Sequence, residues 1–241
     1  MRTRATIFLI FTVVSFPLLS RTKPKTPQAP LETQRYVKDS LHWRIKELDT
    51  GRDSIYLTDI EKNVILEMNM VRSNPKKYAE LYLKPILSKF EGTVLYRGND
   101  LYTQTTEGSA AVKECIDVLS KQRTLDLIYP NRRLRKMAKY HAGLQGVTEQ
   151  IGHNTPKGET LNQRIKRFKI PCYCWGGNID YGLNSARDIV ISLLVDDGVP
   201  SRGHRDNILN NFFNWVGVYF GSHKKYKYMI VTDFVSYRTW F

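Results

Sequence analysis

Two β-rich runs, residues 214–220 and 227–235, flank the turn at 221–225 and predict an antiparallel hairpin late in the sequence. The segments before this hairpin place apolar residues at helical spacing instead. One of them, 189–195, is apolar on nearly every side, so we expect this helix to be buried at the centre of the fold. Helices that precede and surround a small sheet define the α+β class, which we predict here.

Capping and turn residues mark where the other elements begin and end. Thr58 and Glu61 form a capping box before a helix predicted over 59–73, and Asn74-Pro75 ends it. The remaining predicted elements are, in order, a second helix carrying Tyr78 to Leu87, a broken segment with Gly92 and Gly98, a helix over 107–121, a helix after Pro130-Asn131, a short basic helix at 164–167, a strand over 169–174, and two helices capped by Asn184 and Ser201.

The first twenty residues have the pattern of a secretory signal peptide. Met-Arg-Thr-Arg precedes an uncharged, mostly apolar run of about 16 residues, which is shorter than the roughly 20 that span a bilayer. We therefore expect a signal peptide over 1–20, a linker and N-terminal extension over 21–54, and one domain over 55–241, in a secreted or periplasmic protein. An uncleaved N-terminal anchor is the alternative.

The charge balance favours anionic surroundings. The chain has 37 Lys and Arg against 23 Asp and Glu, a net charge of +14, which makes an anionic envelope surface a candidate partner. Three basic clusters, 132–136, 164–169 and 224–225, are candidates for anion contact or are solvated faces. No module of interleaved basic and aromatic residues is present, so we expect no nucleic-acid partner, and we expect a monomer.

The three cysteines are Cys115, Cys172 and Cys174. In an oxidising compartment one disulfide and one leftover thiol are expected. Two cysteines two residues apart on a strand point to one face, and the distance between their Cα atoms is near the outer limit for a disulfide. We therefore expect Cys115 to pair with one of the other two. A metal site built on Cys172 and Cys174 is a weaker alternative.

The first chemically dense segment is the polar loop at 152–158. His153 lies in this loop and on no apolar stripe, so a ligand-facing role is favoured over a surface turn. His141 lies on the apolar stripe of the preceding predicted helix and is interpreted as a core residue. His42 and His223 are interpreted as surface residues.

The second dense segment runs from Leu194 to Leu209. Asp196 and Asp197 follow a predicted helix, whose dipole opposes negative charge there, so we expect Arg202 or Arg205 to pair with them and form a clamp. His204 falls in the first turn of the next predicted helix, where the dipole disfavours the charged ring. A neutral His204 can bind a metal or accept a proton, or it can simply bond the adjacent loop.

The order of several motifs resembles a secreted CAP domain (cysteine-rich secretory, antigen 5, pathogenesis-related 1; also called SCP) of the bacterial type, over roughly residues 55–241. The motifs are Glu67-Met-Asn69-Met-Val-Arg72-Ser-Asn74-Pro75, Lys139-Tyr-His141-Ala, Gly152-His153 followed by Arg164, Gly177-Asn178-Ile179, Ser201-Arg-Gly203-His204-Arg205-Asp-Asn207-Ile208-Leu209, and Val216-Gly217-Val218.

The resemblance implies an α-β-α sandwich whose cleft holds two histidines and two acidic residues and sometimes a metal ion. His153 and His204 match the two histidine positions. Gly177 stands where the family has its first acidic residue, and the second acidic residue has no clear match, although Asp196 and Asp197 lie nearby in the sequence.

These observations predict a binding protein whose cleft takes a small-molecule, lipid, glycan or peptide ligand. The expected ligand contacts are His153, His204, Asn178 and Arg205. The alternative is a hydrolase in which His153 and His204 hold zinc, or act as acid and base with Asp196 or Asp197. Two histidines alone hold zinc poorly, because stable sites usually supply three or four protein ligands.

Overall fold

The computed structural model describes residues 39–98 and 101–237. The predicted signal peptide and the first part of the predicted linker lie outside the described residues. Within those ranges, no helix combines the length and the apolar character needed to cross a membrane.

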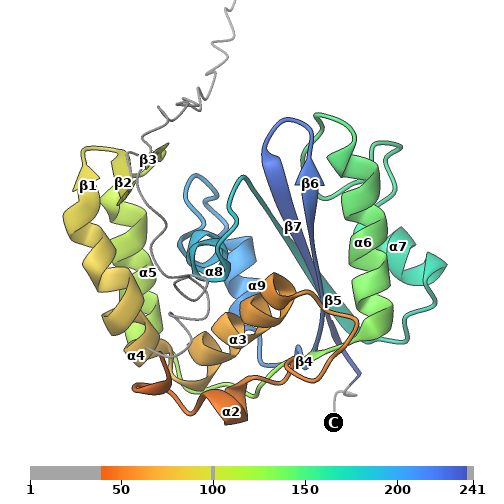
Figure 1. Cartoon of the computed structure of the whole chain (residues 1–241), viewed down its shortest axis with the longest axis horizontal. Helices are drawn as coiled ribbons and strands as arrows, with labels where there is room; N and C mark the ends of the chain where they lie inside the picture. The colour runs from red at the N-terminus through yellow and green to blue at the C-terminus, as the bar shows by residue number, and fades with distance from the viewer. Residues whose placement is uncertain (1–38, 99–100, 238–241) are drawn as a thin grey trace, which may run out of the picture.

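A four-stranded sheet lies between two layers of helices, so the fold is an α+β sandwich (Figure 1). The strand order is β4-β6-β7-β5, with β7 antiparallel to both neighbours and the short β4 parallel to β6. The strands are β4 (Tyr129–Pro130), β5 (Cys174–Tyr181), β6 (Trp215–His223) and β7 (Lys227–Ser236). The last two form the predicted hairpin, and β7 is buried almost along its whole length.

The two helical layers bury opposite faces of the sheet. Phe234 of β7 faces the cluster that contains α3 and α8, while its neighbour Val235 faces α6 and α7. Gly217 of β6 permits the close approach of α6, because a Cβ there would lie 2.2 Å from the carbonyl carbon of Leu134. The helices are α2 (Ile45–Leu48), α3 (Asp59–Ser73), α4 (Pro75–Tyr78), α5 (Ser109–Lys121), α6 (Arg132–Gly146), α7 (Leu161–Arg167), α8 (Ala186–Val195) and α9 (Gly203–Leu209).

Several sequence predictions are confirmed. Thr58 and Glu61 form both bonds of the capping box at the start of α3. The Asn131 side chain caps α6, and His141 is fully buried on the inward stripe of that helix. Helix α8 is buried on nearly every side, as its composition predicts.

The segment after α4 is more irregular than predicted. Instead of one regular helix, α4 continues into a π-helical segment, Ala79–Leu83, and then a 3-10 segment, Lys84–Lys89. The segment expected to be broken forms a second, three-stranded sheet in which β2 pairs with both neighbours. Its strands are β1 (Phe90–Glu91), β2 (Val94–Gly98) and β3 (Leu101–Gln104).

Three predicted boundaries are wrong. The strand predicted over 169–174 is absent, because Lys169 takes a left-handed backbone with φ of 50° that ends α7, and the strand begins only at Cys174. Ser185 rather than Asn184 caps α8. Arg202 rather than Ser201 precedes α9, again with a left-handed backbone.

The prediction that His223 is a surface residue is also wrong. It is 2% exposed, its Nε2 lies 3.0 Å from the Gln150 carbonyl oxygen, and its Nδ1 accepts from the Lys225 and Tyr226 N–H groups. The ring therefore holds the hairpin turn together.

All three cysteines are free thiols, so the predicted disulfide is not formed. Cys115 is fully buried on α5, which packs on α4 and α8. Cys174 lies opposite Ser236 in the sheet, and Cys172 packs against the α6–α7 cluster. The sequence argument failed because it could not place α5 relative to β5.

A row of buried polar side chains on α3 holds the other elements in place. Arg72 is fully buried and donates to the main-chain carbonyl groups of Asp126, Ile208, Asn210 and Phe213 at 2.7 to 3.1 Å. These carbonyls belong to the segment before β4, to the last turn of α9 and to the segment that joins α9 to β6. A guanidinium group presents five N–H donors in one plane, so a single side chain can hold both segments.

Asn69 lies one turn earlier on the same helix and is also fully buried. Its Nδ2 donates to the Leu48 carbonyl, the Thr50 hydroxyl and the Ile128 carbonyl at 2.9 to 3.1 Å, and its Oδ1 accepts from the Ile128 N–H at 2.9 Å. Buried polar groups that are fully bonded in this way specify one arrangement of the segments around them.

A buried ion cluster joins α3 to α8. Arg187 of α8 donates to Glu67 of α3 at 2.7 Å and to Asp39 at 2.5 Å, and its guanidinium lies 3.8 Å from the Tyr82 ring centroid. Burial raises the pKa of Glu67, which the Arg187 charge opposes, and the Tyr78 hydroxyl donates to the Glu67 carboxylate. The cluster fixes the first described residues onto the core.

We predict that Arg72→Met lowers the free energy of unfolding by more than about 3 kcal/mol. Each buried carbonyl group that is left without a donor destabilises the fold by about 1 to 3 kcal/mol. Urea denaturation would measure the change. Arg123→Met, at an exposed position, is the matched control and should stay within about 0.5 kcal/mol of the parent chain. Equal effects of the two substitutions would contradict the role assigned to Arg72.

Candidate functional site

The structure brings His153 and His204 together. His153 lies in the loop after α6, and His204 lies in the first turn of α9. Their ring centroids are 5.6 Å apart with an angle of 33° between the rings. Two segments that are distant in the sequence therefore present two imidazoles to one place, which we name the histidine pair.

Asp196 orients His204. Its Oδ1 lies 2.7 Å from the His204 Nδ1, and its Oδ2 accepts from the His204 backbone N–H at 2.9 Å. The Asp196 side chain is 3% exposed. The residue ends α8, and its backbone has a left-handed conformation, which Asp tolerates better than most residues. A carboxylate at a helix N-terminus is favoured by the dipole, so Asp196 is stabilised by α9 while it holds the ring.

This contact decides which ring nitrogen faces a ligand. A carboxylate accepts a hydrogen bond, so Nδ1 carries the proton toward Asp196, and Nε2 of His204 is left to accept one. The His204 side chain is 20% exposed, which leaves the ring within reach of solvent.

The pKa of His153 is lowered from its ordinary value, which favours the neutral ring. Desolvation by the surrounding protein lowers it, the neighbouring His204 and Arg164 lower it further, and Asp196 acts in the opposite direction. A neutral ring can both donate and accept a hydrogen bond.

Asn178 of β5 holds α9 against the sheet. It is fully buried, its Nδ2 donates to the His204 carbonyl at 2.9 Å, and its Oδ1 accepts from the Asn207 side chain at 2.8 Å. Asn178 therefore positions the backbone that carries His204, and its contact with a ligand stays a prediction.

Arg205 is likewise a positioning residue. It is 2% exposed, forms two bonds to Glu114 of α5 at 2.7 and 2.8 Å, and donates to the Leu194 carbonyl at 2.6 Å. Its predicted contact with a ligand stays a prediction. Arg205 holds the loop through a carboxylate of α5, not through the aspartates that we expected.

The predicted pairing of Asp196 and Asp197 with the arginines is wrong. Asp197 accepts from the backbone N–H groups of Thr106 and Glu107 at 2.6 and 2.8 Å. Arg202 pairs instead with Glu107 at 2.6 Å and with Glu114 at 3.0 Å, and the Arg202 bond lowers the pKa of Glu107 to about 2.

Glu107 and Glu114 are the residues that sequence reasoning missed. They lie seven residues apart, so they share one face of the helix predicted over 107–121. That spacing, set against two arginines three residues apart, was the signal available in the sequence.

Three buried titratable side chains, Arg164, His141 and Asp233, are coupled electrostatically near the loop of His153. Arg164 of α7 is 1% exposed and donates to the carbonyl groups of His153 and Glu159, both at 3.0 Å, which fixes the loop. Burial and the Arg164 charge lower the pKa of His141 to about 4. Burial raises the pKa of Asp233 to about 7, an effect that the Arg164 charge opposes.

Asp233 lies beside Gly177, where the resemblance predicts an acidic residue. The two residues are direct partners in the β5–β7 ladder, and a Cβ at Gly177 would lie 3.3 Å from the Asp233 Oδ1 and 3.1 Å from Leu161. A side chain at 177 would therefore begin against a carboxylate of the central strand.

The donors at this site do not fit a resident zinc ion. Among residues 39–98 and 101–237, no group of three or more His, Cys, Asp or Glu side chains is placed to hold a metal ion. The histidine pair offers two donors, and Asp196 is engaged with Nδ1 of His204. The arrangement is suited instead to hydrogen bonding and to proton transfer at one oriented imidazole.

Comparison with known proteins gives one family. The model of the cysteine-rich secretory protein family, CAP, matches residues 95–235. No curated protein matches the chain.

Three solved structures are similar to parts of this chain. An extracellular protein containing an SCP domain from Bacillus anthracis is 24% identical, with a TM-score of 0.39, over 46% of this chain and 34% of that one. An outer surface protein from Borrelia burgdorferi is 22% identical, with a TM-score of 0.41, over 47% of this chain and 80% of that one. A cysteine-rich secretory protein from Staphylococcus aureus is 14% identical, with a TM-score of 0.38, over 59% of this chain and 44% of that one. The chain thus spans less than half of the Bacillus and Staphylococcus proteins.

We predict that the two neighbours of His153 shift its pKa in opposite directions. His204→Gln should raise the pKa of His153 because it removes a like charge, and Asp196→Asn should lower it because it removes an opposite charge. Titration of the His153 ring protons by NMR would measure both shifts, with His42→Gln, at an exposed position, as the control. Shifts of the same sign in the two variants would contradict the geometry described.

Proposed function

Because this chain belongs to the cysteine-rich secretory protein (CAP) family, we propose that it is an exported binding protein that holds a small or extended ligand at the histidine pair. The ligand is a lipid, a glycan or a peptide. The observation that carries this proposal is the 5.6 Å separation of the His153 and His204 rings. Export is supported by the basic start and the apolar run of residues 1–20.

The chemistry of the pair suits a polar, uncharged group. A ligand placed there meets His204, whose Nε2 has a direction set by Asp196, and His153, whose lowered pKa keeps it neutral. Neutral imidazoles exchange hydrogen bonds with ester, amide and hydroxyl groups without needing a charged partner. Lipids, glycans and peptides all carry such groups.

A second candidate function is hydrolysis by acid and base, and the 2.7 Å contact between Asp196 and His204 favours it. A carboxylate that orients a histidine is the usual support of a general base. In this candidate, His204 takes a proton from water and His153 donates one to the leaving group. The lowered pKa of His153 disfavours the protonated form that such an acid needs, so binding is the function that the site supports best.

We predict that removing the histidine pair removes the ligand. Chain lacking residues 1–20, incubated with a lipid and oligosaccharide extract, should retain ligand in native mass spectrometry. His153→Ala/His204→Ala should reduce its occupancy at least tenfold, equivalent to about 1.4 kcal/mol. His42→Ala is the control. Equal occupancy in all three proteins would contradict the proposal, and time-dependent conversion of the ligand that His204→Ala abolishes would favour the hydrolase.

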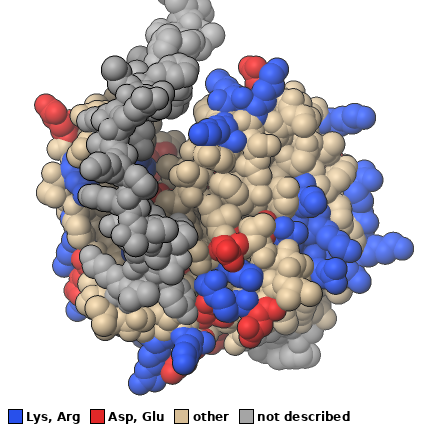
Figure 2. Space-filling model, in the orientation of Figure 1, with Lys and Arg blue, Asp and Glu red and all other residues tan. Residues whose placement is uncertain are grey.

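We also propose that an anionic envelope surface is a partner of the α6–α7 face. Figure 2 shows Lys and Arg side chains gathered on the side of the molecule that these two helices form. Neither helix contains an acidic residue. The exposed cations of the two helices are Arg132, Arg133, Lys136, Lys139, Lys166 and Arg167. Arg167 pairs with Glu159 at 2.5 Å, and the other five cations can attract anionic surfaces over about one Debye length, roughly 8 Å at physiological ionic strength.

We predict that Lys136→Glu/Lys166→Glu weakens binding to vesicles of anionic phospholipid, as measured by sedimentation. Binding of the parent chain should fall as salt is raised, because surface charges are screened. The matched control is Lys46→Glu/Lys113→Glu, which makes the same charge change at exposed positions on α2 and α5. Equal losses in both double variants would show that only net charge matters and would contradict a role for the α6–α7 face.

A further inference from the structure

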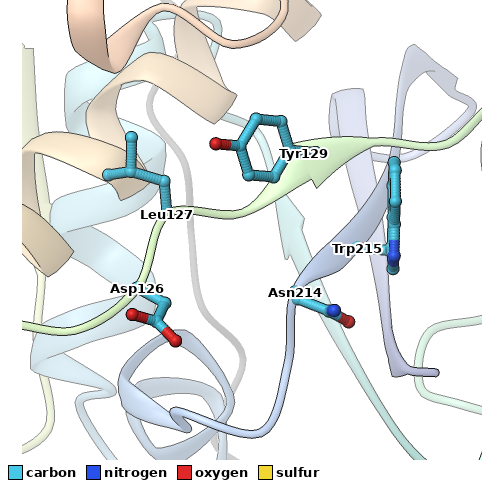
Figure 3. A pocket seen from close by; sticks show the side chains of 5 residues that line it. All are labelled: Asp126, Leu127, Tyr129, Asn214 and Trp215. Carbon is cyan, nitrogen blue, oxygen red and sulfur yellow. The ribbon is translucent and has the colours of Figure 1, made fainter. Parts of the chain in front are cut away.

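A pocket lies apart from the histidine pair, between the segment before β4 and the start of β6 (Figure 3). It has a volume of about 320 Å³ and is lined by Asp126, Leu127, Tyr129, Asn214 and Trp215. This volume is at the small end of the range for ligand sites. Neither His153 nor His204 lines it, so a ligand here would be independent of the function proposed above.

Two aromatic rings form one side of this pocket. Tyr129 and Trp215 are direct partners across the β4–β6 ladder, with ring centroids 6.0 Å apart and an angle of 53° between the rings. Tyr237 packs against Trp215, also at 6.0 Å, whereas Tyr129 is 47% exposed. The rings therefore present apolar surface that is supported by the core and open to solvent.

Polar groups form the other side. Figure 3 shows Asp126 beside Leu127 on the segment before β4, and Asn214 beside Trp215. Both residues line the pocket, and a carboxylate and a side-chain amide can exchange hydrogen bonds with the hydroxyl groups of a ligand.

The walls of the pocket are held rigid. The carbonyl of Asp126 accepts from Arg72 at 2.7 Å, the N–H of Asp126 donates to Asn211 Oδ1 at 3.0 Å, and the N–H of Tyr129 donates to the Asn214 carbonyl at 3.0 Å. A site whose backbone is already fixed loses little conformational entropy when a ligand binds.

We infer that this pocket binds a neutral pyranose unit of a glycan. A sugar ring carries apolar C–H faces that pack on aromatic rings, and hydroxyl groups that bond to carboxylate and amide oxygens. The pocket combines these two kinds of surface. A quaternary ammonium would also suit two aromatic rings and a carboxylate, but it has no N–H or O–H group and cannot form a hydrogen bond with the side-chain amide of Asn214. An anionic sugar would be repelled by Asp126.

Titration of the chain with a panel of neutral tetrasaccharides of glucose, mannose and N-acetylglucosamine, followed by ligand-detected NMR, tests the inference. We expect at least one of them to bind with a Kd of about 1 mM or below. Tyr129→Ala and Asn214→Leu should each weaken that binding at least tenfold. Tyr129 is half exposed, so its substitution leaves the core intact. Matched controls at exposed positions are Tyr102→Ala and Asn162→Leu, which should leave binding unchanged.

Three results would overturn the inference. The first is the absence of binding by every sugar of the panel, and the second is displacement of the bound sugar by choline. The third is a loss of binding in His153→Ala/His204→Ala that equals the loss in Tyr129→Ala, which would place the sugar at the histidine pair. If the double variant still binds the sugar, the pocket and the histidine pair are separate sites. The inference about the pocket and the proposed function can then be tested, and can fail, independently.

Discussion

The buried guanidinium of Arg72 is the contact on which both candidate sites depend. It holds the carbonyl groups of Ile208 and Asn210, which end α9, and α9 begins with the turn that carries His204. It also holds the carbonyl of Asp126, which lines the aromatic pocket. This charged group is tolerated away from solvent because its N–H groups donate to main-chain carbonyl oxygens that would otherwise lack a hydrogen bond. One side chain therefore stabilises the core and fixes two surface sites.

Charge is distributed very differently in the two helical layers. Around α9, Arg202 and Arg205 meet Glu107 and Glu114, and Asp196 meets His204, so the neighbourhood of the histidine pair is nearly balanced. On α6 and α7 the cations have no acidic residue on the same helices. The balanced region suits an uncharged ligand, and the cationic face suits an anionic surface, which is why we assign them separate partners.

Much of the fold could be predicted from local patterns. The capping box of Thr58 and Glu61, the apolar run of α8 and the hairpin of β6 and β7 depend on neighbours within a few residues, so the sequence states them directly. The predictions failed where tertiary contacts override a local signal. His223 is polar and lies at a turn, yet the hairpin closes around it, and Lys169 adopts a left-handed backbone that ends α7 before the strand begins.

The sequence by itself determined the class of the fold, the family resemblance and the two histidines, because these depend on periodicity and on motif order. Only the tertiary structure decided how the site is built. In the tertiary structure Asp196 bonds to the His204 ring, Arg205 pairs with Glu114, and Asp233 lies beside Gly177. Each of these contacts joins residues from different elements, and although the spacing of Glu107 and Glu114 marks them as a pair, which charges meet across elements follows from packing geometry.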